Sequence, residues 1–384
     1  MKNKDTAEVH GRAVRDARDV MTVKGDTGRL SVLTGNTSEK VRGLWERVFT
    51  DESRRYNDFY FKRKAADSLC YSFSTDASDS SQAMLIRTPY SVALRTETGA
   101  WKMKADYIVG VATDRDFRHQ GFMDCILKYA LNDMYKDGLP FTFLIPADPA
   151  IYSSYGFRYF YFRKHFDKML RFAAADGRYY DEELEEPSEE WQQFEKKAVK
   201  KEYSAYIRRS GRYYRDLFDE CRADAGGTVM IRRKSDGTAA GCYTYITEDD
   251  RRVITGVAAD GELEEVCALA GQQRSPFMMG RIVNAQNALE QLRTKKKYDR
   301  RVVLKFSLSD DIIAENNGCY ECRVSDRKCK VKRIQGKGTE NCPQLDITDL
   351  LDLFGTADTQ DCGDFDKNAG RLFSFEKCVF NELS

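Results

Sequence analysis

The stretch TDRDFRHQGFMDCILKYAL, residues 113–131, joins two segments with different hydrophobic patterns. Before it, residues 105–113 (ADYIVGVAT) are almost continuously apolar, which is typical of a strand buried on both faces. After Gly121 the apolar residues recur every three or four positions, which predicts an amphipathic helix ending near Gly138. The apolar run FTFLIPA (141–147) predicts a second buried strand. These segments together predict a β-α-β unit.

Two interpretations of the turn between the first strand and the helix remain open from these residues alone. A single glycine suits a tight turn with a purely structural role. Alternatively, the first N–H groups of the helix have no intrahelical partners, and Gly121 would let an anion approach them. Arg118 and His119 add positive charge there. The turn is neither a G-x-G-x-x-G motif nor a P-loop, because the second glycine and the Lys-Ser/Thr pair are missing.

Length and charge limit the class of protein. A chain of 384 residues predicts two or three domains. With 62 basic and 61 acidic residues, the net charge of +1 favours neither nucleic acid nor an anionic membrane, and we interpret the basic cluster 293–301 as an exposed loop. No apolar run approaches the roughly 20 residues of a membrane span. The charged N-terminus lacks the apolar core of a signal peptide, so we expect a cytoplasmic protein.

The cysteines and histidines restrict the chemistry. Eleven cysteines, an odd number without a secretion signal, indicate free thiols. The pair Cys319 and Cys322 (CYEC) fits either a zinc site or a short strand. The strand is favoured, since residues three apart point to opposite faces, and we predict no metal. The three histidines, His10, His119 and His165, all precede residue 166, so a triad built on histidine is hard to assemble.

The remaining elements are predicted from periodicity and turn residues. A strand at 29–35 precedes an amphipathic helix at 38–49, for which Ser38 is the expected N-cap. We interpret the acidic run 181–190 as a linker that leads into a solvated helix. The later elements are an antiparallel meander at 226–260 with a turn at 236–237, a strand and a helix at 277–292, short strands at 301–334, a helix at 346–355 and a terminal strand from residue 371.

Three segments resemble one enzyme family. RHQGFM (118–123) resembles the pyrophosphate loop, R/Q-x-x-G-x-G/A, of GNAT-type N-acetyltransferases, with Met123 in the place of a small residue. IYSSYGF (151–157) resembles the I-Y-x-x-F/Y-G-F/Y signature of the enhanced-intracellular-survival (Eis-type) branch, in which a larger residue in the Met123 slot is usual. FMMGRIV (277–283) resembles that branch's Met-Met-x-Arg segment, and the final FNELS resembles its short F-N-E-x tails.

The resemblance implies an α+β fold of three domains. Tandem GNAT folds, with mixed central sheets flanked by helices, would be followed by a sterol-carrier-protein-like α/β domain that ends in the active site. The expected boundaries are a polar N-terminal extension at 1–25, a catalytic GNAT domain at 26–165, a second, degenerate GNAT-like domain at 166–275 and the sterol-carrier-protein-like domain at 276–384. The resemblance also implies a homo-oligomer of hexameric rings.

The resemblance further implies direct transfer of acetyl from acetyl-coenzyme A to a neutral amine. The diphosphate of the coenzyme would lie on Arg118, His119, Gln120, Gly121, Phe122 and Met123, and its pantetheine on the main chain of Val111 and Thr113. Tyr152 would give a proton to the leaving thiolate, and the α-carboxylate of Ser384 would take one from the amine. Without the motif, Tyr152 would be one core tyrosine among 21.

Two functions follow as alternatives. The first is an N-acetyltransferase that acts on a cationic acceptor, such as a polyamine, an aminoglycoside or a lysine side chain. Asp51, Glu52 and Asp58 would border its acceptor groove, although each also suits a solvated surface. The second is a non-catalytic sensor that binds an acyl-coenzyme A or a lipid. Tyr152 and the intact loop favour the enzyme.

Overall fold

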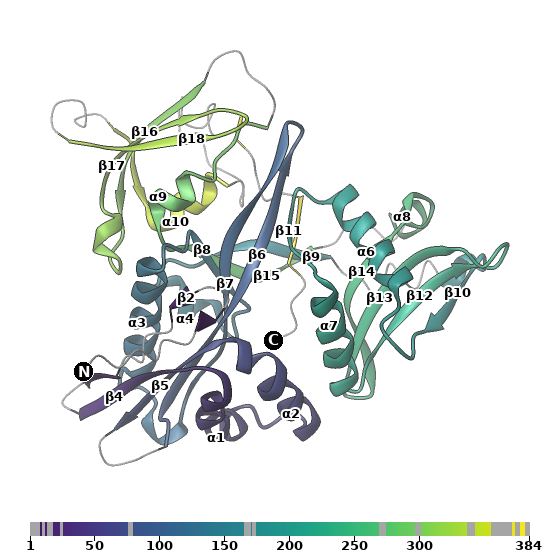
Figure 1. Cartoon of the computed structure of the whole chain (residues 1–384), viewed down its shortest axis with the longest axis horizontal. Coiled ribbons are helices and arrows are strands. Elements are labelled where there is room, and N and C mark those ends of the chain that lie inside the picture. The colour runs from purple at the N-terminus through teal and green to yellow at the C-terminus, as the bar shows by residue number, and fades with distance from the viewer. Residues whose placement is uncertain are drawn as a thin grey trace.

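The computed structural model describes residues 8–9, 12–13, 18–23, 26–75, 80–164, 170, 174–268, 274–295, 301–335, 342–354, 371–372 and 377–380. These residues form a central ten-stranded sheet, with one four-stranded sheet on either side of it (Figure 1). Helices pack on all three sheets, so the predicted α+β class is confirmed. None of the helices in the described residues combines the length and apolarity that crossing a membrane requires.

The central sheet collects strands from distant parts of the chain. Its order is β3 (Arg18–Val23), β4 (Asp26–Leu33), β5 (Leu69–Thr75), β6 (Ala83–Thr96), β7 (Gly99–Thr113), β8 (Phe141–Leu144), β15 (Arg274–Ile282) and β9 (Arg158–Lys164), while β11 (Ala205–Ile207) pairs with β6 and with β20 (Cys378–Val379). Strand β3 and a small hairpin, β1 (Glu8–Val9) and β2 (Arg12–Ala13), lie within the expected extension 1–25. Part of that segment therefore belongs to the sheet.

Helices cover both faces of the central sheet, as the apolar sequence of β7 predicts. On one face lie α1 (Glu39–Val48), α2 (Arg54–Arg63) and the 3₁₀ turn η2 (Ala65–Asp67), and on the other lies α3 (Phe122–Lys136). Ser38 stands at the start of the first helix as predicted, but its side chain does not cap it. A 3₁₀ turn, η1 (Gly35–Ser38), runs directly into α1, so Ser38 has helical dihedral angles and its side chain makes no cap hydrogen bond.

A buried arginine ties α3 to the sheet. Arg87, on β6, is fully buried and binds Asp106 on the neighbouring strand β7. Its remaining nitrogens donate to Asp133 and Asp137 near the end of α3, at 3.2 and 2.6 Å. The Tyr71 hydroxyl donates to Asp133 at 2.5 Å. Charge-assisted hydrogen bonds of this kind are short and directional, so they hold α3 in one position on the sheet.

The second sheet is the antiparallel meander that the sequence predicts. It consists of β10 (Tyr179–Glu183), β12 (Gly227–Arg233), β13 (Ala239–Glu248) and β14 (Arg251–Ala259), with α6 (Glu189–Glu202), α7 (Gly211–Ala223) and α8 (Gly261–Ala268). The interpretation of the whole acidic run as a linker is wrong at its start, because Asp181–Glu183 belong to β10. Tyrosines of β13 hold this edge strand, since Tyr243 donates to Asp181 at 2.7 Å.

The third sheet contains the CYEC segment. It consists of β18 (Cys329–Ile334), β17 (Gly318–Val324), β16 (Val302–Ser309) and β19 (Gln344–Asp346), next to α9 (Ala285–Leu289), η4 (Ala314–Asn316) and α10 (Ile347–Asp352). Cys319 is half-buried and Cys322 fully buried within β17, which confirms the predicted strand. Among the described residues, no three His, Cys, Asp or Glu side chains are grouped as metal ligands.

Candidate active site

The parallel strands β7 and β8 part at the centre of the molecule. They pair only from Ala105 to Tyr107, opposite Phe141 to Phe143. Beyond Tyr107, β7 continues to Thr113 along β6, and no described strand pairs with its other edge. In open α/β sheets, ligands bind beyond the carboxyl ends of strands at such a divergence. The free main-chain edge of β7 is therefore the first component of the candidate site.

A glycine bulge bends β7 where it leaves β8. Between the pairs Ile86–Val109 and Met84–Ala112, β7 contains one residue more than β6. Gly110 takes up this extra length with a φ of +60°, and a side chain there would stand 2.5 Å from the Trp45 ring of α1. A bulge of this kind bends the strand and often borders an active site. We did not predict it, although an isolated glycine in an apolar run is its usual signal.

The amides at the start of α3 form the second component. Gly121 is the N-cap and has a φ of +91°, and His119 has a φ of +62°. The first hydrogen bond at the start of α3 runs from the Cys125 amide to the Gly121 carbonyl at 3.0 Å. The amides of residues 122–124 lie before it, so they are the unsatisfied donors of a helix N-terminus. Together with the helix dipole they suit a diphosphate.

The side chains of this loop divide into exposed and structural groups. Arg118 and His119 are exposed. The Arg118 Nε donates to the Thr113 carbonyl at 3.3 Å, which places the guanidinium beside the end of β7. The 3₁₀ turn η3 (Arg115–Phe117) precedes the loop, and Gln120 fastens it by donating to the Asp116 carbonyl at 3.1 Å. Phe122 is buried against Phe73, so only its amide faces the loop's surface.

Met123 is accommodated by contact with the second motif. The Tyr155 hydroxyl lies 3.8 Å from its sulfur and donates to Asp124 at 2.9 Å. The methionine side chain therefore packs toward the segment after β8, and its size fills that contact. This explains why the position holds a large residue in a loop that otherwise keeps the family pattern.

Tyr152 lies beyond the end of β8. It belongs to the short helix α4 (Pro149–Ser153), which Asp148 caps by accepting from the Ala150 amide at 2.9 Å. The Tyr152 side chain is 7% exposed and packs edge-on against Phe157. Burial raises the pKa of Tyr152 to about 12. Within the described part of the chain its hydroxyl has no hydrogen-bond partner, so the phenol is a protonated donor available to a ligand.

The turn after Tyr152 closes on a buried arginine. Gly156 has a φ of +77°, and a side chain there would collide with the Arg281 guanidinium of β15. Arg281 is fully buried and donates to both oxygens of Asp310 at 2.8 and 2.9 Å. Asp310 in turn accepts from the amides of Ile312 and Ile313. The glycine of IYSSYGF and the arginine of FMMGRIV thus contact each other.

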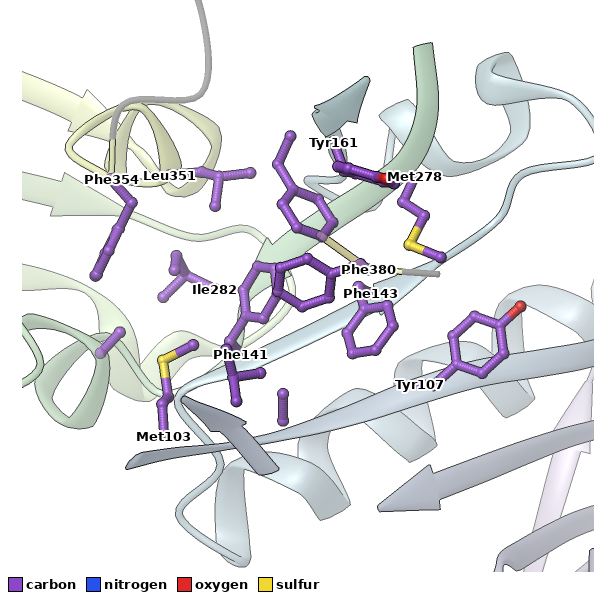
Figure 2. Close-up of a cluster of buried hydrophobic side chains, with 14 of the residues drawn as sticks. Met103, Tyr107, Phe141, Phe143, Tyr161, Met278, Ile282, Leu351, Phe354 and Phe380 are labelled. Atoms are coloured by element: carbon purple, nitrogen blue, oxygen red, sulfur yellow. The ribbon is translucent and has the colours of Figure 1, made fainter. Parts of the chain in front are cut away.

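The last described residues return to the point where β7 and β8 part. Phe380 is fully buried, and its ring centre lies 5.3 Å from Phe143 and 5.0 Å from Phe160 (Figure 2). Phe143 stacks on Tyr107, the last residue of β7 that pairs with β8. Just before Phe380, β20 runs parallel to β11. Ser384 itself, like His10 and His165, lies outside the described residues.

Of the three acidic residues expected near an acceptor groove, Glu52 stands apart. Burial, together with the nearby carboxylates Asp224 and Asp51, raises its pKa to about 7. Asp58 is exposed and is held by Arg42 at 2.5 Å. The Asp51 side chain is exposed. Of the three carboxylates, Glu52 is therefore the one that is partly shielded from solvent, near Asp224 at the end of α7.

The fold and this site define an acyltransferase. Residues 30–160 match the family model for the acetyltransferase (GNAT) domain. The chain therefore carries a GNAT acetyltransferase domain, whose fold uses an acyl-coenzyme A, and the expected enzyme class is confirmed. The free edge of β7 and the amides of residues 122–124 fit such a ligand. No curated protein matches the sequence.

Solved structures share the fold over almost the whole chain. A probable N-acyltransferase from Enterococcus faecalis is 17% identical, with 92% of this chain and 97% of that chain covered and a TM-score of 0.65. A GCN5-related N-acetyltransferase from Anabaena variabilis is 15% identical, with 91% and 98% covered and a TM-score of 0.64. Eis1 from Mycobacterium abscessus is 13% identical, with 92% and 98% covered and a TM-score of 0.57. These likenesses concern the fold.

Proposed function

We propose that this protein is an Eis-type N-acetyltransferase that moves acetyl from acetyl-coenzyme A directly to a primary amine of a cationic acceptor. The observation that carries the proposal is the divergence of β7 and β8. The amides of residues 122–124 lie beyond the end of β7, and Tyr152 lies beyond the end of β8. A diphosphate site and a proton donor at one divergence suit a thioester substrate.

In this proposal the loop and β7 bind the coenzyme. The amides of residues 122–124 donate to the diphosphate, and Arg118 adds positive charge next to His119, Gln120 and Gly121. The free edge of β7 aligns the pantetheine through the main chain of Val111. Thr113 contributes less than Val111, since its carbonyl already accepts from Arg118.

The acetyl transfer is one displacement. The amine nitrogen forms a bond to the thioester carbon, the carbon–sulfur bond breaks, and the sulfur leaves as a thiolate that takes the Tyr152 proton. A free thiol has a pKa of about 8.5. Apolar surroundings raise the pKa of Tyr152 to about 12, and they also raise the pKa of a thiol held beside it. The difference between the two pKa values therefore stays small, so the proton transfer costs little free energy.

The amine proton would go to the α-carboxylate of Ser384. Phe380 is anchored beside Phe143, and the four residues after it span at most about 14 Å when extended. That reach covers the region between β7 and β8. Glu52, on the α1–α2 side, would add the negative field that draws a cationic acceptor.

The same proposal covers the architecture. The sheet β10–β12–β13–β14 would be the degenerate GNAT-like domain and the sheet β18–β17–β16–β19 the sterol-carrier-protein-like domain, as the similarity to Eis1 along the whole chain supports. Strands β11, β15 and β20 belong to the central sheet. The proposed domains at 166–275 and 276–384 therefore each contribute strands to the sheet of the catalytic domain. Hexameric assembly and a cytoplasmic location stay predictions.

A thiol-release assay tests the function. The protein is incubated with acetyl-coenzyme A and with a panel of amines: spermidine, an aminoglycoside and a lysine peptide. We expect coenzyme A thiol to appear at a rate that depends on the amine, together with an acetylated product detected by mass spectrometry. Tight binding of the coenzyme without turnover of any amine would instead support the alternative, a non-catalytic sensor of an acyl-coenzyme A or a lipid.

A further inference from the structure

A cavity lies between α6 and the β6–β11 pair, and the proposed coenzyme site uses none of its residues. It measures about 210 Å³, and its charged lining consists of Glu195, Lys196, Lys200, Arg208 and Arg209. The cavity thus carries four cationic side chains and one carboxylate. Its volume is below the range of pockets that hold drug-sized ligands, so it suits a small ion.

The one carboxylate of this cavity is already neutralised. Glu195 forms an ion pair with Arg209 and accepts the Tyr214 hydroxyl on its other oxygen. The Arg209 side chain is 5% exposed, and its Nε is buried without a hydrogen-bond partner among the described residues. A buried guanidinium in the wall favours a negative charge in the cavity beside it.

The other three cations have no carboxylate of their own. No described carboxylate forms an ion pair with Lys196, Lys200 or Arg208, although Lys201, on the same helix, lies 3.9 Å from Glu264. Lys196 lies over the Tyr214 ring, 5.1 Å from its centre, which keeps its charge beside the cavity. Like charges around a small volume repel one another, so the arrangement favours an anion between them.

We propose that this cavity binds a small anion with two negative charges, of the phosphate-monoester or dicarboxylate type. Lys196, Lys200 and Arg208 would hold its charged oxygens at the mouth, and the Arg209 guanidinium would add positive charge at the wall. The site is separate from acetyl transfer, so it stands whether or not the proposed reaction is correct.

Titration calorimetry of the full chain tests the site, with inorganic phosphate and succinate as probes at constant ionic strength. We expect saturable binding of one equivalent in the cavity. The double variant K196A/K200A should bind about tenfold or more weakly, because it removes two charge-assisted hydrogen bonds to the anion. The matched control is K197A/K201A, which removes two lysines of the same helix that do not line the cavity and should bind as the wild type.

Phosphate could also bind at the start of α3, so each titration is repeated with saturating coenzyme A. Binding in the cavity persists with coenzyme A present. Binding of phosphate alone identifies a phosphate ligand, and binding of both probes identifies a dianion site. No binding of either probe, equal weakening in both double variants, or complete loss of binding with coenzyme A overturns the proposal. The single variant R208A is a second test of the cavity site and should also weaken binding about tenfold.

Discussion

At the scale of single residues, the site depends on side chains whose neighbours set their chemistry. Burial raises the pKa of Tyr152 to about 12, which keeps its phenol protonated. Its position depends on Gly156, which leaves room for the Arg281 guanidinium beside the same turn. Arg281 is held in turn by Asp310. A phenol, a glycine and a buried ion pair from distant parts of the chain thus act as one unit.

We predict that Tyr152→Phe lowers kcat by about 100-fold, the usual weight of a general acid, and changes coenzyme affinity less than about twofold. The ring remains in its apolar cluster, so the fold is kept. Stopped-flow turnover and coenzyme titration measure the two quantities. Tyr159→Phe, a half-buried tyrosine of β9, is the matched control and should be as active as the wild type. A kcat within about threefold of wild type would remove Tyr152 from the mechanism.

At the scale of elements, a bulge within β7 and the connection between α1 and α2 determine which elements contact each other. The Gly110 bulge bends β7 away from β8 and packs on Trp45 of α1. The connection between α1 and α2 places Glu52 near the Asp224 carboxylate at the end of α7. The bulge packs β7 against α1, and the connection between α1 and α2 brings Glu52 near the end of α7.

Glu52 gives a pH-dependent prediction. Its pKa in the folded chain is about 7, above its ordinary value of 4.5, so the folded state binds the proton more tightly than the unfolded state. The free energy of unfolding therefore falls as the pH rises from about 4.5 to about 7, and it is level above that. We expect Glu52→Gln to abolish this fall and to stabilise the protein at pH 8 by about 1 kcal/mol, a value reduced for partial exposure.

Urea unfolding at pH 4 and at pH 8 measures this difference. At pH 4 the wild type and Glu52→Gln should have the same free energy of unfolding, since both side chains are neutral there. Glu97→Gln, in the exposed turn between β6 and β7, serves as the control and should change stability at neither pH. A stabilisation of Glu52→Gln that is equal at both pH values would show that titration of Glu52 is not its cause.

At the scale of the whole molecule, the end of the chain completes the central sheet. Strand β20 adds to β11, and Phe380 fills the space beside Phe143 and Phe160 (Figure 2). Strand β15 is inserted between β8 and β9, so segments on either side of the third sheet return to the centre (Figure 1). Strands from before and after the third sheet therefore belong to the central sheet.

We predict that one glycine appended after Ser384 lowers kcat about tenfold or more, because it moves the α-carboxylate by up to about 3.5 Å. Coenzyme affinity should not change. The matched control is Ser384→Ala, which alters the side chain and keeps the carboxylate in place. Unchanged turnover in the extended protein would exclude this carboxylate as the base and leave Glu52 as the next candidate.

The sequence by itself determined the local elements. The continuous apolar pattern of β7, the helical period after Gly121 and the turn residues near 138 and 237 predict strand, helix and turn where the structure has them. The loop at residues 118–123 and Tyr152 were found by a resemblance of motifs. Periodicity and turn chemistry act over a few residues, so a short window of sequence is enough to specify them.

Only the tertiary structure decided how these elements meet. The insertion of β15, the pairing of β11 with β20, the burial of Glu52 and the contact of Gly156 with Arg281 all join residues far apart in the chain. Hydrophobic pattern marks a residue as buried but does not name its neighbour, because burial is non-directional. Those neighbours bury Tyr152 and part of Glu52, and this burial raises the pKa of both groups.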